Sequence, residues 1–209
     1  MKKFLPLLFA LVSLLVGCQD SEAQKTAEQN TYEKIQQIFV NMKTYQSQAT
    51  VEYKSNKSSN TYETLQKCRI TGEYRVEVVG PEKVAGNITL SDGKTIYQFN
   101  TRISGKIAVA TNETQERSEI FLTSFIKNYL KSMEVSISVA KLANDPCTTL
   151  EAKIPGDHPY LSSEKLWVDN KTLKPVKLII YDPQGSERII VTYKTFEYNV
   201  ELSDTDFTA

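Results

Sequence analysis

The chain has 209 residues, and its 25 basic and 25 acidic side chains give a net charge of zero at pH 7. Without a basic excess, nucleic acid is not expected as a partner. The length is enough for one domain with a sizeable core, and the sequence contains no internal repeat that would indicate a second domain.

The N-terminus has the order of a bacterial export signal. Lys2 and Lys3 precede an apolar run from Phe4 to Val16, and Leu15-Val16-Gly17-Cys18 resembles a lipobox. The apolar run is about 13 residues long, shorter than the ~20 needed to span a bilayer as a helix. The resemblance implies cleavage before Cys18 and a diacylglycerol on its thiol. We therefore expect an exported protein that is held on a membrane surface by its lipid.

This pattern divides the chain into three parts. Residues 1–17 are expected to be the lipoprotein signal peptide, and residues 18–30 the lipidated cysteine with a flexible tether. The tether prediction rests on the polar, apolar-poor composition of residues 19–30. Residues 31–209 are expected to form a single folded domain.

Two helices are predicted in this domain. Apolar residues at helical spacing predict the first over residues 28–43. The second is predicted over residues 116–131, with Ser118 as its N-cap. Its apolar residues cover a broad stripe, so this helix is expected to lie in or across the core.

The rest of the domain is rich in strand signals. Asp92-Gly93 between two strand-like runs predicts a hairpin, and Ser-Asn-Lys-Ser-Ser-Asn-Thr at 55–61 predicts a longer turn. About nine to eleven antiparallel strands are predicted, over residues 46–54, 62–79, 84–90, 94–99, 106–111, 135–142, 148–154, 164–169, 174–182 and 187–194.

Two cysteines remain in the mature domain, Cys68 and Cys147. Export permits a disulfide between them, which would close a loop of about 80 residues. The alternative is a pair of buried free thiols that behave as small hydrophobic side chains. The sequence leaves both interpretations open.

Catalytic chemistry has few candidates in this chain. The single histidine, His158, lies in a Pro/Gly loop, and a zinc site needs three or four such ligands. No G-x-S-x-G elbow presents a serine for a catalytic triad that would also need this histidine. Glu73 and Glu77 are expected on an outward, solvated strand face. We therefore predict no catalytic residues, no metal site, no cofactor and no enzymatic activity.

Several segments resemble the LolA/LolB-like superfamily of lipoprotein carriers. They are Leu-Trp-Val-Asp-Asn-Lys-Thr-Leu-Lys-Pro-Val-Lys at 166–177, Tyr-Asp-Pro-Gln-Gly at 181–185, and Gly-Glu-Tyr-Arg-Val-Glu at 72–77. The resemblance implies an α+β fold with a single LolA-like domain. Its strongly curved antiparallel sheet would form an open half-barrel, with helices on the concave side.

Within that superfamily, the lipobox, Lys-rich composition and short tether resemble the GerS-type spore-germination lipoproteins of clostridia. The resemblance implies a role in spore cortex modification and germination, in the intermembrane space around the forespore. The protein would bind and activate a cortex N-acetylmuramoyl-L-alanine amidase, itself a zinc enzyme, so that muramic-δ-lactam can form.

Two alternatives stay open at this stage. The protein could instead be a carrier that shelters acyl chains in its concave groove. A dry, open apolar groove would favour the carrier, whereas a groove filled by the second helix would favour the partner-binding role. The free edges of an open sheet also suggest a homodimer formed by strand exchange, with residues 55–61 as the hinge.

Overall fold

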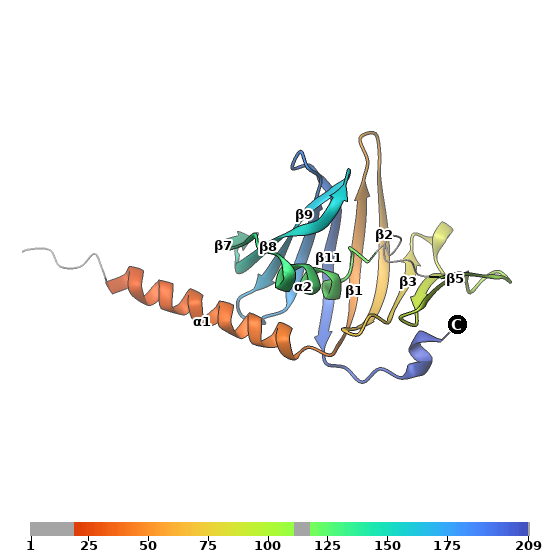
Figure 1. Cartoon of the computed structure of the whole chain (residues 1–209), viewed down its shortest axis with the longest axis horizontal. Coiled ribbons are helices and arrows are strands. Elements are labelled where there is room, and N and C mark those ends of the chain that lie inside the picture. Colours follow the sequence, from red (N-terminus) through yellow and green to blue (C-terminus); the bar gives the residue numbers. More distant parts are fainter. Residues whose placement is uncertain (1–18, 111–117, 209) are drawn as a thin grey trace, which may run out of the picture.

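The computed structural model describes residues 19–110 and 118–208. In these ranges the chain forms two α-helices, two 3₁₀ turns and eleven strands (Figure 1). The elements are α1 (Gln19–Asn41), β1 (Thr44–Lys54), β2 (Ser59–Arg69), β3 (Tyr74–Gly80), η1 (Glu82–Val84), β4 (Asn87–Ser91), β5 (Thr95–Asn100), β6 (Lys106–Ala110), α2 (Leu122–Lys131), β7 (Val135–Leu142), β8 (Asp145–His158), β9 (Leu161–Asp169), β10 (Pro175–Tyr181), β11 (Glu187–Tyr198) and η2 (Asp204–Phe207).

All eleven strands belong to one antiparallel sheet, in the order β6-β5-β4-β3-β2-β1-β11-β10-β9-β8-β7. Most neighbours are consecutive hairpin strands, and the pairing of β1 with β11 joins the two halves of the sheet. The predicted fold class is confirmed: α+β, a single domain, and one antiparallel sheet with helices. The sheet is open, with β6 and β7 as its edges, and it is less strongly curled than we expected.

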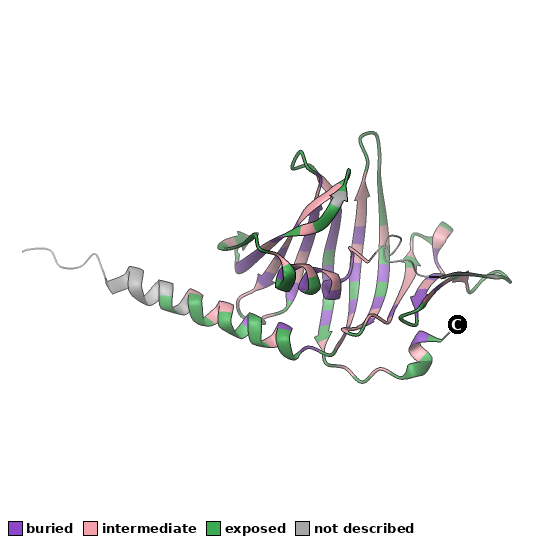
Figure 2. Ribbon diagram, in the orientation of Figure 1, coloured by how far each residue is buried: buried purple, intermediate pink, exposed green. Residues whose placement is uncertain are grey.

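Both helices pack against the same face of the sheet, which we call the inner face (Figure 1). Alternate residues of each central strand point to this face, as the period-two pattern predicts. Burial is concentrated in the central strands and on α2, whereas most of α1 is exposed (Figure 2). Only the end of α1 nearest the sheet joins the core, through the buried side chains of Ile35 and Phe39, and Met42 directly after the helix is buried with them.

The first helix begins earlier than predicted, because α1 is helical from Gln19 onward. Residues 19–30, which we expected to form a flexible tether, are therefore helical. They are rich in Ala, Glu and Gln, which have high helix propensity, and no apolar stripe is needed where the helix leaves the sheet. At 1.5 Å per residue, the 23-residue helix is about 35 Å long.

The second helix begins later than predicted, at Leu122. Ser118 is not its N-cap. The backbone N–H of Phe121 donates a 3.0 Å hydrogen bond to the Ser118 carbonyl, in a separate turn before the helix. Phe121 precedes the helix in an extended conformation and is itself buried. Burial of this aromatic ring explains why the helix starts after it. Residues 116 and 117 lie outside the described residues.

The turns follow the sequence closely. The strand-like run 62–79 divides into β2 and β3 around Gly72, whose φ of +121° favours glycine. The predicted hairpin at Asp92-Gly93 is confirmed between β4 and β5. There, the Asp92 carboxylate accepts hydrogen bonds of 2.8 Å from the N–H groups of Lys94 and Thr95.

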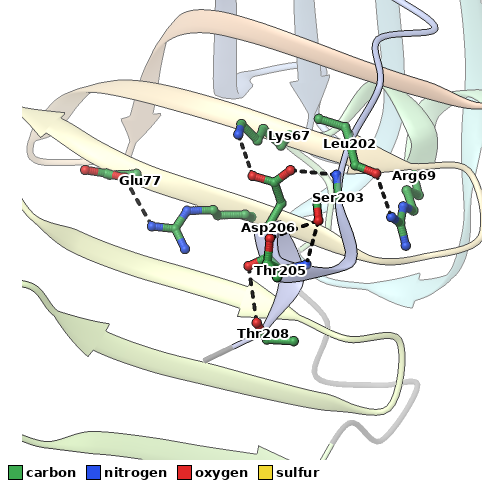
Figure 3. Close-up of polar contacts among 9 residues, drawn as sticks. Lys67, Arg69, Glu77, Leu202, Ser203, Thr205, Asp206 and Thr208 are labelled. Carbon is green, nitrogen blue, oxygen red and sulfur yellow. Dashed lines mark hydrogen bonds and ion pairs between the residues drawn. The ribbon is translucent and has the colours of Figure 1, made fainter.

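The C-terminal segment lies on the outer face of β2 and β3 (Figure 3). The Lys67 ammonium is 2.6 Å from Asp206, and the Arg69 guanidinium donates to the Leu202 carbonyl at 2.9 Å. Arg69 also lies over the ring of Phe207, which is buried, with 4.7 Å between the guanidinium carbon and the ring centre. This half of the outer face is therefore partly covered by the chain's own C-terminus.

Candidate functional site

The inner face is the natural place for a binding groove in an open sheet, and α2 occupies its centre. Leu122 and Phe125 are fully buried, and Ile126 is 1% exposed. The ring of Phe121 packs on Tyr74, with 4.6 Å between ring centres. The middle of the inner face is therefore filled by the chain's own large apolar side chains.

A buried hydrogen-bond chain fixes the start of α2 to the sheet. The Tyr45 hydroxyl accepts a bond of 3.3 Å from the Leu122 N–H and donates one of 3.2 Å to the Gln66 side-chain carbonyl. Burial raises the pKa of Tyr45 well above its ordinary value, so this hydroxyl keeps its proton. Because the bonds are shielded from water, they hold the helix N-terminus in one position.

A cavity of about 1340 Å³ remains at one end of α2, between the helix and the turns of the neighbouring hairpins. Its lining includes the aromatic rings of Tyr53 and Phe121 as well as the charged side chains of Lys54 and Arg188. Lys54 is ion-paired with Glu187 at 2.7 Å, and Arg188 with Asp182 at 2.6 Å. The lining is therefore mixed in character, unlike the dry apolar groove that would favour an acyl-chain carrier.

The most unusual ionisable group is Glu164 on β9, which is fully buried under α2. One carboxylate oxygen accepts a hydrogen bond of 2.8 Å from the Asn128 side chain on α2. The other oxygen has no hydrogen-bond partner in the described part of the chain. Burial raises the pKa of Glu164 to about 7, with a smaller contribution from the charge of Glu119.

Sequence reasoning missed this residue, although it left a signal. Glu164 alternates with the buried Leu166 and Val168 along β9, so period two already places its carboxyl group on the inner face. A raised pKa is common in catalytic acids. Glu164, however, does not line the cavity, so a substrate there could not reach its carboxyl group.

Of the predicted site residues, the two cysteines that the structure describes do not come together. Cys18, the predicted lipid attachment site, lies outside the described residues. Cys68 and Cys147 are both free and buried, on β2 and β8. Four strands separate β2 from β8 in the sheet. The structure therefore has two buried thiols in place of the disulfide, and burial raises the pKa of both.

The remaining candidates each have a polar contact, and His158 is also among the residues that line the cavity. His158 is exposed, and its Nδ1 accepts a 3.1 Å hydrogen bond from the Tyr160 N–H. Glu73 and Glu77 pair with Arg69 and Arg75, respectively. Within the described ranges no three His, Cys, Asp or Glu side chains lie close enough to hold a metal ion. No helix in these ranges has the length and apolarity to cross a membrane.

A family model described as "Sporulation protein YdcC-like" matches residues 1–207. The chain belongs to this YdcC-like family of sporulation proteins. No curated protein sequence matches the chain.

The chain is also similar to several solved structures. The chain is similar to a structure described as the CwlD amidase from Clostridioides difficile in complex with the GerS lipoprotein, at 31% identity and a TM-score of 0.50. This match covers 82% of our chain and 96% of the matched chain. An uncharacterized conserved protein from Thermus thermophilus matches at 11% identity and a TM-score of 0.53, over 86% and 91% of the two chains. LolA superfamily protein NE2245 from Nitrosomonas europaea matches at 16% identity and a TM-score of 0.45, over 87% and 97%.

Proposed function

We propose that this sporulation-family protein is a membrane-anchored, non-enzymatic lipoprotein that binds a cortex N-acetylmuramoyl-L-alanine amidase and supports its activity. The observation that carries the proposal is the 31% identity to a chain of the complex between CwlD and the GerS lipoprotein. The match extends over 96% of the matched chain. Muramic-δ-lactam formation and germination would then depend on the complex.

The filled inner face supports the same proposal. Leu122, Phe125 and Ile126 occupy the space in which an acyl chain would lie, so the domain is better suited to present a surface than to enclose a ligand. Within the described ranges, no cluster of three His, Cys, Asp or Glu side chains could hold a metal ion, and the buried Glu164 does not line the cavity. The chemistry would therefore belong to the zinc enzyme, and this protein would act by binding.

Binding can raise activity without any contributed catalytic group. If the lipoprotein binds the zinc-loaded, competent state of the amidase more tightly than other states, it shifts the population toward that state. The lipid on Cys18 would hold the pair at a membrane facing the cortex, in the intermembrane space around the forespore. The helix α1, about 35 Å long, would separate the domain from that membrane.

The test uses the full-length lipoprotein in mild detergent with the amidase from the same organism. The lipoprotein alone should leave peptidoglycan intact, and adding it to the amidase should increase cleavage or zinc retention. His158→Ala serves as a control that should behave like the wild type. Unchanged δ-lactam content in the cortex of a strain that lacks the gene would contradict the proposal.

The acyl-carrier alternative has one observation in its favour, the cavity beside α2 with its aromatic residues. Organic extraction of the purified protein followed by mass spectrometry distinguishes the two functions. A stoichiometric lipid, in addition to the covalent anchor, would favour the carrier. Its absence together with amidase binding would favour the partner role.

A further inference from the structure

The cavity beside α2 lies where three hairpins, β1–β2, β8–β9 and β10–β11, extend past the helix at the same end of the sheet (Figure 1). Residues 53–57 of the first hairpin, residues between 154 and 161 of the second, and Arg188 and Ile189 of the third line it. Its volume of about 1340 Å³ exceeds the roughly 300–1,000 Å³ of most small-molecule sites. The space therefore suits a ligand with more than one ring or residue, and binding of an amidase does not by itself use it.

The lining of this cavity carries an excess of positive charge. Lys54 and Arg188 are ion-paired, as described above. The ammonium groups of Lys57 and Lys127 have no ion-pair partner among the described residues. Glu119 is the one acidic side chain among the described lining residues. Two unpaired ammonium groups are therefore set against one carboxylate, which favours an anionic ligand over a neutral one.

Aromatic rings and hydroxyl groups line the same space. Tyr160 is 61% exposed, and Tyr53 is half-buried. A sugar ring presents C–H groups that are attracted to the negative face of an aromatic ring. The hydroxyl groups of Ser118 and Ser124 make no hydrogen bond within the described part of the chain, so both can bond to a ligand. Rings, hydroxyl groups and ammonium groups together fit an anionic saccharide better than an acyl chain, which could use the rings alone.

The class of saccharide follows from the proposed function, on which this inference rests. An N-acetylmuramoyl-L-alanine amidase adds water across the amide that joins the lactyl group of the muramoyl sugar to L-alanine. The oxygen of the water stays on the lactyl carbon as part of a carboxylate, and the peptide leaves as an amine. The cleaved glycan therefore gains a negative charge where the uncleaved glycan has a neutral amide. A lactam is an intramolecular amide, so its formation must later consume this carboxylate.

We propose that the cavity beside α2 binds the peptide-free muramoyl glycan that the amidase releases. Lys57 and Lys127 bind its lactyl carboxylate, and the rings of Tyr53 and Tyr160 contact its sugars. The site holds the cleaved glycan between amide hydrolysis and lactam formation. Hydrogen bonds between an ammonium group and a carboxylate are roughly twice as strong as those between neutral groups. The site therefore distinguishes the product of the amidase from its substrate by the charge on the lactyl group.

The first test titrates three disaccharides into the full-length lipoprotein in mild detergent, by calorimetry at low salt. The disaccharide of N-acetylglucosamine and N-acetylmuramic acid carries the free lactyl carboxylate and should bind. The same disaccharide with its lactyl group joined to L-alanine amide is neutral, and chitobiose lacks the lactyl group. Both should bind about tenfold more weakly or not at all, because neither presents a carboxylate. Equal affinity for the acid and its L-alanine amide, or no binding of the acid, would overturn the proposal.

The second test removes the two ammonium groups one at a time. Lys57→Gln and Lys127→Gln each keep a side chain that can donate a hydrogen bond but lose the charge. Each should weaken binding of the acidic disaccharide by about tenfold. The matched control is Lys131→Gln, one turn further along α2 at an exposed residue outside the lining, and it should bind like the wild type. Unchanged affinity in both Lys57→Gln and Lys127→Gln would refute the assigned site.

A separate measurement distinguishes this inference from the proposed function. Binding of the amidase to the wild-type lipoprotein is followed by co-sedimentation, without any saccharide. Amidase binding without binding of the acidic disaccharide would overturn this inference alone and leave the proposed function in place. Binding of the disaccharide without amidase binding would confirm the saccharide site, but it would contradict the proposed function and the place of the site between the two reactions.

Discussion

The buried carboxyl group of Glu164 makes the stability of this domain depend on pH in a defined window. Its pKa is raised from the ordinary value of 4.5 to about 7, mainly because its charged form is removed from water. The folded chain therefore binds this proton more tightly than the unfolded chain does. As pH rises from about 4.5 to about 7, the unfolded chain gives up the proton first, and the free energy of unfolding falls.

The size of the effect follows from the two pKa values. Each tenfold difference in proton affinity corresponds to about 1.4 kcal/mol, so the change from 4.5 to about 7 amounts to about 3 kcal/mol. Glu164→Gln removes the titration and keeps an oxygen that can accept the bond from Asn128. We expect this variant to be more stable than the wild type above pH 7, by up to about 3 kcal/mol.

Urea unfolding of the chain from residue 19 onward, followed by Trp167 fluorescence between pH 5 and 8, measures this effect. The wild type should lose stability across this range, while Glu164→Gln should show a much flatter profile. Glu197→Gln, at an exposed position on β11, should retain the wild-type profile. If the profiles of the wild type and Glu164→Gln run parallel, the carboxyl group does not have the proton affinity that its burial indicates.

Three further outcomes are expected. Phe125→Ala should lower the free energy of unfolding by about 3–5 kcal/mol in urea, since it removes a fully buried ring from α2. Trp167→Ala should lower the free energy of unfolding by less than the ~3 kcal/mol expected for a fully buried aromatic side chain. Trp167 is only partly buried, and it lies on the outer face near Lys165 and Lys177. Cys18→Ala should abolish incorporation of labelled palmitate, and normal labelling of that variant would contradict the lipobox assignment.

Local patterns in the sequence predicted most of the fold. Strands follow from period-two alternation, and the Asp92-Gly93 turn follows from the bonds that an aspartate side chain makes to nearby backbone N–H groups. Helix boundaries were less predictable. Residues 19–30 have helix-forming side chains but no apolar stripe, so composition indicated a tether where the structure has helix. At the other helix, burial of Phe121 moved the start beyond Ser118.

Features that depend on long-range pairing could not be predicted. The neighbours β1 and β11 are more than 130 residues apart in the sequence, and no local signal specifies their contact. The distance between Cys68 and Cys147 depends on that strand order, so both cysteine interpretations stayed open until the strands were placed. The cavity beside α2 likewise appears only when the structure brings the three hairpins to one end of the sheet.

The strand order also explains why α2 fills the middle of the inner face. β6 and β7 are consecutive strands in the sequence but form opposite edges of the sheet, so the chain between them must cross the sheet. It crosses on the inner face, as α2. The size of the inward side chains of this crossing helix therefore determines whether the inner face is open. With Leu122, Phe125 and Ile126 at those positions the middle of the inner face is closed, and the cavity beside α2 is the space that remains there.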